Sequence, residues 1–187
     1  MAHRVCPWWL GYWLASPLRG LIEKPADILA PYVTDGMTVL EPGPGMGFFT
    51  LELARRVGQR GRVIAVDLQP RMLEGLKRRA RKAGLLDRID VRLATPESLG
   101  IADITGVDFV LAFALVHEIP SPAGFFAEMA RVLRPGGTLL FAEPKGHVKD
   151  ALFSEEIEAA IEAGLVEADR PAIRRSRAVL FSKPPAR

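Results

Sequence analysis

Three glycines alternate with other residues directly after an acid, in the run Glu41-Pro42-Gly43-Pro44-Gly45-Met46-Gly47. Glycine has no Cβ, so such a loop lets bare backbone approach a ligand, and a helix predicted over 48–57 points its amides at that ligand. A dinucleotide-binding loop needs G-x-G-x-x-G, but Phe48 stands where the third glycine would fall. The acid Glu41 repels phosphate and suits a cation. The loop therefore favours a cationic, nucleotide-like ligand over a dinucleotide.

The segments that must position this loop alternate between strand and helix. The hydrophobic pattern predicts strands at 38–41, 62–67, 89–93, 107–113 and 138–143, and helices at 48–57, 70–83, 122–133 and 154–163. Ser121 before Pro122 is a typical helix start. Segments 165–169 and 176–182 are expected to pair as a terminal hairpin. Such alternation predicts a parallel sheet that is covered on both faces.

Three motifs in this order resemble those of the class I S-adenosylmethionine (SAM) dependent methyltransferases, in particular the type 11/25-like domain. The first is Glu41-x-Gly43-x-Gly45-x-Gly47, the second is the strand 62–67 that ends in Asp67, and the third is the run 131–140 with its Pro-Gly-Gly turn. The motifs cover about residues 36–145, and the last forty or so residues fit the family's closing helix and strand pair.

The resemblance implies an α/β fold: a doubly wound, Rossmann-like sheet of seven strands, mostly parallel with an antiparallel last strand. Residues 1–187 are expected to form a single domain, in line with the chain length. Within it, 1–34 would be an N-terminal helical cap or lid, 36–145 the cofactor-binding core, and 150–183 the closing helix and strand pair.

The resemblance also implies that SAM is the cofactor. Asp67 would accept both ribose hydroxyls, because an acceptor-only carboxylate matches a vicinal diol. Thr95 stands where the family often has an acid against the adenine, so either its hydroxyl and nearby amides read the adenine or the alignment is shifted there. Helix packing explains Met72 as well as adenine contact does. The residues expected at the cofactor are Glu41, Gly43, Pro44, Gly45, Met46, Gly47, Phe48, Asp67, Leu68, Met72, Thr95, Pro96, Glu97, Ala112, Phe113, Ala114 and His117.

The fourth predicted strand runs into residues 112–120, which in the family face the methionine part of the cofactor and the substrate. They lack the Asn-Pro-Pro-Tyr type of loop, which disfavours methylation of a base amino group. His117 has an ordinary pKa near neutrality and could take a proton from a hydroxyl, thiol or amine. The competing interpretation is that His117 and Glu118 merely start a loop. With His147, which follows the fifth strand, they are the candidate catalytic residues.

The first fourteen residues are rich in aromatic side chains. Trp8, Trp9, Tyr12 and Trp13 are expected to form part of a substrate pocket beneath a lid. The alternatives are a packed helix, an oligomer contact or a membrane-surface helix. His3 and Cys6 could face one cleft with His117 and His147, but they are too scattered to predict a metal site.

The composition of the chain gives expectations about where the protein is located. No run of eighteen apolar residues or signal-peptide pattern exists, so we expect a cytoplasmic protein without a membrane span, as a monomer or homodimer.

We expect SAM-dependent methyl transfer to a small molecule, at an O, S, N or C atom that the sequence does not identify. One alternative is an RNA methyltransferase that uses the basic helix 70–83. Another is a SAM-binding partner or sensor protein without turnover.

Overall fold

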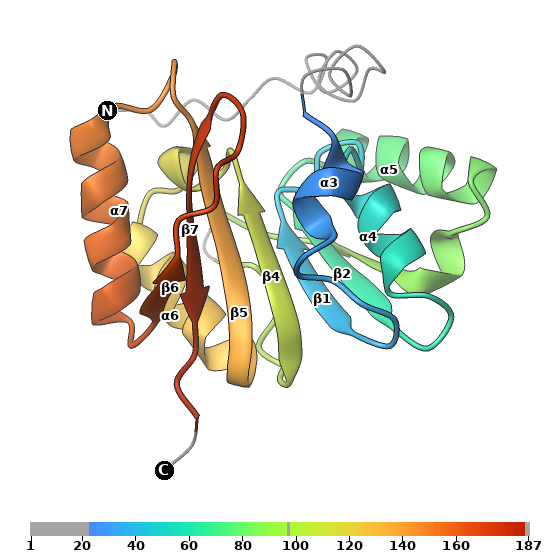
Figure 1. The fold of residues 1–187 in the computed structure, drawn as a ribbon. Helices are drawn as coiled ribbons and strands as arrows, with labels where there is room; N and C mark the ends of the chain where they lie inside the picture. The colour runs from blue at the N-terminus through green and yellow to red at the C-terminus, as the bar shows by residue number, and fades with distance from the viewer. Residues whose placement is uncertain (1–22, 97, 186–187) are drawn as a thin grey trace. The chain divides into compact units, whose positions relative to one another are not determined.

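The computed structural model describes residues 23–96 and 98–185, which belong to two compact units (Figure 1). The first unit extends as far as Asp103, and the second begins at Ile104. The expected aromatic pocket of Trp8, Trp9, Tyr12 and Trp13 lies outside the described residues, as do His3, Cys6 and Glu97. Each unit is described by itself.

The first unit is built on three parallel strands in the order β3-β2-β1. Their bounds are Thr38–Pro42 for β1, Arg62–Asp67 for β2 and Ile89–Leu93 for β3. The four residues of β2 from Val63 to Val66 are at most 1% exposed, so this strand is covered on both faces as the apolar run predicts. Helices α4 (Thr50–Arg56) and α5 (Pro70–Lys82) connect the strands, and α3 (Pro25–Leu29) packs against α4.

Helix α5 is amphipathic. The spacing of Met72, Leu73, Leu76 and Ala80 predicts a buried stripe with the lysines and arginines of the helix on a solvated face, and these four side chains are buried. The cations of α5 are exposed, with the exception of Arg79, which is half-buried. A short 3₁₀ helix, η1 (Leu86–Arg88), leads from α5 into β3.

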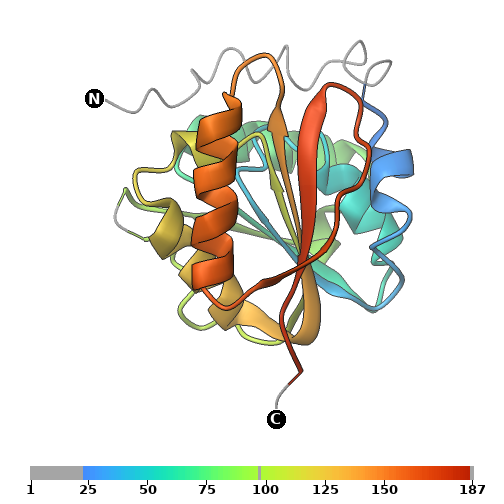
Figure 2. The same cartoon turned by 60° about the vertical axis from the view of Figure 1, so that its left-hand side comes forward.

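The second unit carries four strands in the order β4-β5-β7-β6. Their bounds are Val107–Phe113 for β4, Leu133–Pro144 for β5, Val166–Asp169 for β6 and Ser176–Ser182 for β7. β4 and β5 are parallel, whereas β7 runs antiparallel to both β5 and β6. The 3₁₀ helix η2 (Val116–Glu118) follows β4, and α6 (Pro122–Val132) packs against α7 (Asp150–Glu162). Figure 2 shows α7 in front of the strands of this unit.

The fold class predicted from the sequence, a mixed and mostly parallel sheet of seven strands with alternating helices, is confirmed. The predicted start of α6 is also confirmed, because Ser121 Oγ accepts a hydrogen bond of 3.2 Å from the Gly124 amide. Among the described residues, no helix is both long and apolar enough to cross a membrane.

Three element boundaries differ from the predicted ones by two residues or more. The Pro-Gly-Gly segment is a bulge within β5, because Leu133 pairs with Val107 while Thr138 already pairs with Phe109. α4 begins at Thr50 instead of residue 48, since Gly47 has a φ of 83° that no helix accommodates. α7 begins at Asp150, four residues early, where an acid in the first turn complements the helix dipole.

Candidate functional site

The loop after β1 uses its glycines in two different ways. Gly43, Gly45 and Gly47 all have left-handed backbones, with φ values of 69°, 52° and 83°. Among the described residues, no atom lies within 4 Å of a Cβ added to Gly45, whereas a Cβ added to Gly47 would overlap the side chain of Leu76. Gly47 is therefore needed for packing against α5, and Gly45 leaves room for a ligand against the backbone.

Asp67 at the end of β2 braces the same loop. Its Oδ2 accepts a hydrogen bond from the Gly45 amide at 3.2 Å, and its Oδ1 accepts one from the Gln69 amide at 2.9 Å. A carboxylate is an acceptor-only group with two oxygens, which matches a pair of hydroxyl donors. The two backbone amides orient the carboxylate of Asp67 at the end of β2.

Arg79 of α5 also holds the glycine loop, through a hydrogen bond to its backbone. Its Nη1 donates to the Met46 carbonyl at 2.6 Å, and burial lowers the pKa of its guanidinium. The prediction that the cations of this helix form a solvated face is therefore wrong for Arg79, which is half-buried. The signal that could have found it is spacing, because Arg79 lies three residues after Leu76 and seven after Met72, on the buried stripe.

Glu41 is a buried acid beneath the glycine loop. Its residue is 4% exposed, and neither its Oε2 nor the Thr50 Oγ1 has a hydrogen-bond partner among the described residues. Burial raises the pKa of Glu41 to about 8; the nearby Thr50 hydroxyl opposes that rise, and the charge of Asp67 adds to it. An unpartnered buried carboxyl of this kind is suited to a cationic ligand, which would compensate its charge.

Glu41→Gln is expected to stabilise the protein increasingly as the pH rises. The folded-state pKa of about 8 lies above the ordinary 4.5, so between these values the folded chain binds a proton that the unfolded chain has lost. Stability from this group is therefore full below pH 4.5 and falls toward pH 8, by up to about 1.4 kcal/mol per pH unit. The glutamine of the variant keeps the shape of the side chain without titrating.

Urea unfolding of wild type and variant at pH 5 and pH 8 measures this difference. Glu74→Gln, at an exposed position of α5, is the control and should change stability little at either pH. A stability difference between Glu41→Gln and wild type that stays constant with pH would show that Glu41 ionises normally in the folded protein.

The other residues expected at the cofactor fall into several environments. Leu68 is 41% exposed, whereas Met72 is buried in the core stripe, as the packing interpretation requires. Thr95 and Pro96 are exposed, and the Thr95 amide donates to the Ser98 carbonyl at 2.9 Å. That amide is therefore occupied within its own turn, which leaves the hydroxyl as the free group of Thr95.

The loop residues and the end of β4 complete this set. Pro44, Met46 and Gly47 are buried, Gly43 is exposed, and Phe48 is half-buried with its ring 5.1 Å from that of Phe49. Ala112 is fully buried inside β4, and Phe113 and Ala114 are half-buried.

The chain turns sharply after β4 to present His117. Ala114 has a φ of 54°, and its amide donates to the Ala142 carbonyl of β5 at 2.8 Å. A left-handed alanine is strained by about 1 kcal/mol, and such outliers are frequent at functional sites. The turn delivers the chain into η2, which carries His117 and Glu118.

Glu143 of β5 holds His117 at two points. Its Oε2 lies 2.7 Å from Nδ1 of the imidazole, and its Oε1 accepts a hydrogen bond from the His117 backbone amide at 3.2 Å. The Glu143 side chain is fully buried, and that of His117 is 11% exposed. The His147 ring packs edge-on at 5.0 Å, and Glu118 Oε1 lies 3.9 Å from Nε2. The three candidate catalytic residues therefore meet within this unit.

A second buried acid, Glu156, faces this cluster from α7. It is 1% exposed, and neither carboxyl oxygen has a hydrogen-bond partner within residues 23–96 and 98–185. Burial and then the charge of Glu143 raise the pKa of Glu156 to about 7, while His117 opposes the rise. Burial by itself would lower the pKa of His117, but the hydrogen bond and charge of Glu143, followed by Glu118 and Glu156, raise it overall.

Sequence reasoning missed both Glu143 and Glu156, although each left a signal. Glu143 ends a buried strand directly before proline, as Glu41 does. Glu156 falls between Phe153, Ile157 and Ala160, so it lies on the buried stripe of its helix.

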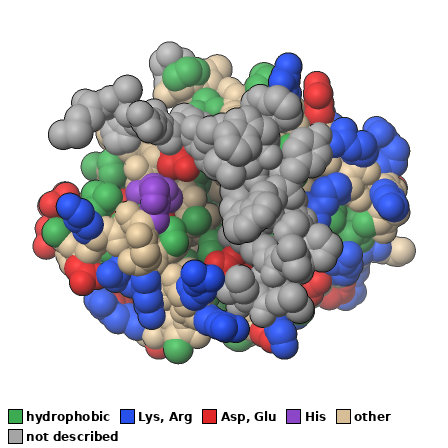
Figure 3. Space-filling view, turned by 90° about the horizontal axis from the view of Figure 1, so that it is seen from above, with side chains coloured by type: hydrophobic (Ala, Val, Ile, Leu, Met, Phe, Trp, Pro, Cys, Tyr) green, Lys and Arg blue, Asp and Glu red, His purple; other side chains and the backbone are tan. Residues whose placement is uncertain are grey.

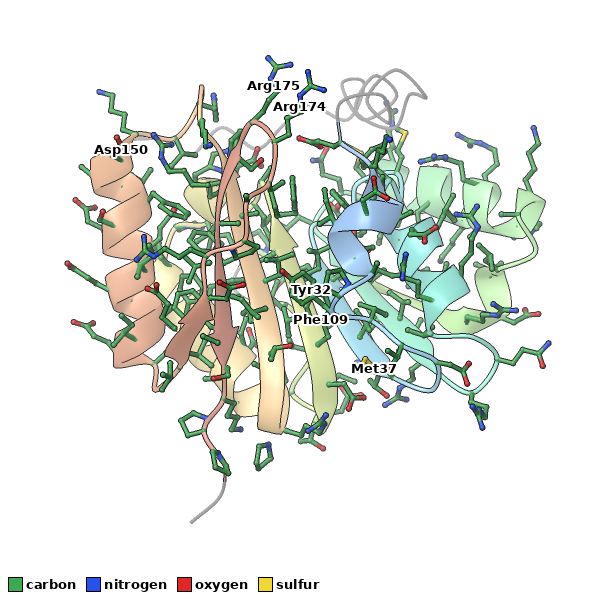
Figure 4. All side chains as sticks on the ribbon, viewed as in Figure 1. Tyr32, Met37, Phe109, Asp150, Arg174 and Arg175 are labelled. Atoms are coloured by element: carbon green, nitrogen blue, oxygen red, sulfur yellow. The ribbon has the colours of Figure 1, made fainter. Side chains whose placement is uncertain are left out.

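Part of this cluster reaches the surface. Figure 3 shows imidazole (purple) on the face seen from above, with an acidic side chain (red) beside it and lysine and arginine side chains (blue) farther away. Arg174 and Arg175 are exposed in the turn before β7 (Figure 4), and Arg177 pairs with Asp150. Within the described part of the chain, no group of three or more His, Cys, Asp or Glu residues is arranged to hold a metal ion.

Comparison with known proteins shows the family and the fold of the chain. A family model described as a methyltransferase domain matches residues 40–141, which is more than half of the chain. A solved structure of a SAM-dependent methyltransferase from Aquifex aeolicus shares the fold, with a TM-score of 0.84 and 24% identity over 95% of this chain and 99% of that one. The chain belongs to the methyltransferase domain family.

Two curated relatives are similar over part of their length. The ubiquinone biosynthesis O-methyltransferase of Methylocella silvestris is 35% identical over 130 residues, which are 70% of this chain and 48% of that protein. The ubiquinone/menaquinone biosynthesis C-methyltransferase UbiE of Klebsiella pneumoniae is 33% identical over 111 residues, 59% of this chain and 44% of that protein. The chain spans about half the length of the curated relatives it matches.

Proposed function

We propose that this protein transfers the methyl group of SAM to a small-molecule nucleophile. The observation that carries the proposal is the buried carboxyl of Glu41, whose Oε2 has no hydrogen-bond partner among the described residues, beneath a glycine loop in which no described atom lies within 4 Å of a Cβ added to Gly45. A sulfonium or ammonium group favours the ionised form of such a carboxyl and compensates its charge, whereas a pyrophosphate opposes that ionisation.

Asp67 supplies the second half of the cofactor site in this proposal. Its carboxylate is fixed by the amides of Gly45 and Gln69, and as an acceptor-only group it matches the two hydroxyls of a ribose. When bound, SAM supplies an electrophilic methyl group on a positively charged sulfur. The protein's part is to align the acceptor, exclude water and take up the proton that the acceptor loses.

The small-molecule acceptor is supported by the curated relatives, whose names place them in quinone biosynthesis. His117 is the proposed general base, and its position after β4 supports that role, because ligands of a doubly wound sheet bind beyond the carboxyl ends of the strands. Glu118 and His147 are its neighbours on the surface of the same unit.

Calorimetry with SAM, S-adenosylhomocysteine and NAD tests the cofactor assignment. SAM and S-adenosylhomocysteine are expected to bind, and NAD is not, because Glu41 occupies the place where a pyrophosphate would need a neutral or positive loop. Asp90→Ala, an exposed acid on β3, serves as a control that keeps SAM binding. NAD binding without SAM binding would refute the proposal.

A further inference from the structure

Glu143 fixes the orientation and the proton position of His117. Its two oxygens contact two nitrogens of the same residue, the backbone N and Nδ1. The backbone N is a donor, and an ionised carboxylate can only accept, so Nδ1 must carry the hydrogen that Glu143 Oε2 accepts. The neutral imidazole then has its lone pair on Nε2.

Nε2 is placed to act on a ligand. Within the described part of the chain it makes no hydrogen bond, since its nearest acid is Glu118 Oε1 at 3.9 Å. β4 and β5 are parallel, so η2 and the Glu143 end of β5 lie at the same edge of the sheet. Ligands of such sheets bind beyond this edge. The strained turn at Ala114 brings His117 there.

The charges around the imidazole are negative on three sides. Glu143 faces the imidazole from β5, Glu118 from η2 and Glu156 from α7. The ring of His147, in the loop after β5, packs against it edge to face. These carboxyls stabilise the imidazolium that forms when Nε2 takes a proton. They equally stabilise an incoming ammonium in its protonated form, which cannot attack a methyl group.

The need for such a base depends on the acceptor. A thiol with a pKa of about 8.5 ionises readily near neutral pH without strong help. A phenolic hydroxyl has a pKa of about 10, so it gains much more from a base whose conjugate acid has been strengthened. The cluster is therefore better matched to a weakly acidic hydroxyl than to a thiol or an amine.

We propose that Glu143 is the positioning residue of a buried dyad in which His117 Nε2 removes the proton of a weakly acidic hydroxyl on the methyl acceptor. The inference rests on the proposed methyl transfer. Nε2 takes the proton while the electron pair of the O–H bond stays on oxygen. That oxygen forms its bond to the methyl carbon as the carbon–sulfur bond breaks and its pair returns to sulfur.

The dyad itself is tested by nuclear magnetic resonance of ¹⁵N-histidine-labelled protein without any ligand, with His117→Ala to assign the signals. In wild type, neutral His117 should carry its hydrogen on Nδ1. A glutamine side chain has one acceptor oxygen for two N–H donors, so in Glu143→Gln the hydrogen should move toward Nε2. The titration midpoint of His117 should fall by at least about one pH unit. Glu143→Asp should restore part of that shift.

Turnover tests the acceptor class, with catechol, thiophenol and benzylamine as matched aromatic probes and mass spectrometry of the products. Catechol should be methylated, and Glu143→Gln should lower kcat by about a hundredfold with KM within about twofold. Adding Glu143→Gln to His117→Ala should slow the reaction no further, because Glu143 acts through the imidazole. The acid limb of the pH–rate profile should also move to lower pH in Glu143→Gln.

Each opposite result has a distinct meaning. Product from thiophenol or benzylamine alone, or from no probe although SAM binds, overturns the hydroxyl assignment. A further loss of rate in the double variant, or an unchanged tautomer in Glu143→Gln, overturns the positioning role. Absence of SAM binding refutes the proposed function instead, and it leaves the magnetic resonance result to decide on the dyad.

Discussion

Asp67→Ala is expected to weaken SAM binding by about tenfold to more than a hundredfold. The variant removes charge-assisted hydrogen bonds to the ribose hydroxyls, each of which contributes about 1.5–3 kcal/mol. It also frees the amides of Gly45 and Gln69, so the glycine loop loses one of its two braces. Calorimetry with S-adenosylhomocysteine measures the effect.

Two controls separate ribose binding from loop support. Asp90→Ala removes an exposed acid that pairs with Arg92 in the same unit, and it should leave the dissociation constant within about twofold. Thermal unfolding of the ligand-free Asp67→Ala variant shows whether the loop is still held by Arg79. An unchanged dissociation constant would mean that Asp67 does not bind the ribose.

His117→Ala is expected to slow methyl transfer by about a hundredfold and to leave the affinity for SAM nearly intact. The rate falls because the acceptor loses its general base, which typically contributes about 10²–10⁴-fold. The cofactor affinity persists because the residues proposed to hold SAM, Glu41 and Asp67, are unchanged. Single-turnover rates with catechol, together with calorimetry, measure both quantities.

This variant also leaves Glu143 without the imidazole that it holds, and a buried carboxylate that loses its partner is destabilising. Rates are therefore compared well below the thermal midpoint of the variant. The double variant His117→Ala/Glu143→Gln removes the stranded charge, so it should recover stability without recovering rate. Full activity of His117→Ala would return His117 to a structural role in the loop after β4.

The sequence by itself determined the fold class, because the evidence for it is local. Apolar runs such as 62–67 and 107–113 predict buried strands, and turn and capping residues such as Ser121 and the loop glycines mark where helices and strands end. All of the predicted helices and strands exist, and the errors of the prediction are confined to where they begin and end. Gly47 delays α4, the bulge at Gly136 extends β5, and Asp150 starts α7 early.

The sequence also predicted candidate site residues from their place at the end of a strand. Glu41, Asp67 and His117 each follow or end a predicted strand, and ligands of a doubly wound sheet bind beyond such strand ends. Which residues serve packing and which face open space was decided only in three dimensions. Met72 is buried in the core, and Gly47 packs against Leu76, whereas Gly45 has no described atom against its Cβ position. Arg79 does not lie on the solvated face of its helix but donates a hydrogen bond to the Met46 carbonyl.

Only the tertiary structure could reveal Glu143 and Glu156 as partners of His117. Glu143 lies 26 residues from His117 along the chain and reaches it across the pairing of β4 with β5. Glu156 approaches from α7, and its pKa is raised by burial and then by the charge of Glu143, which β5 places against it. Periodicity shows which face of an element is buried, but the chemistry of a buried acid depends on what the neighbouring elements place against it.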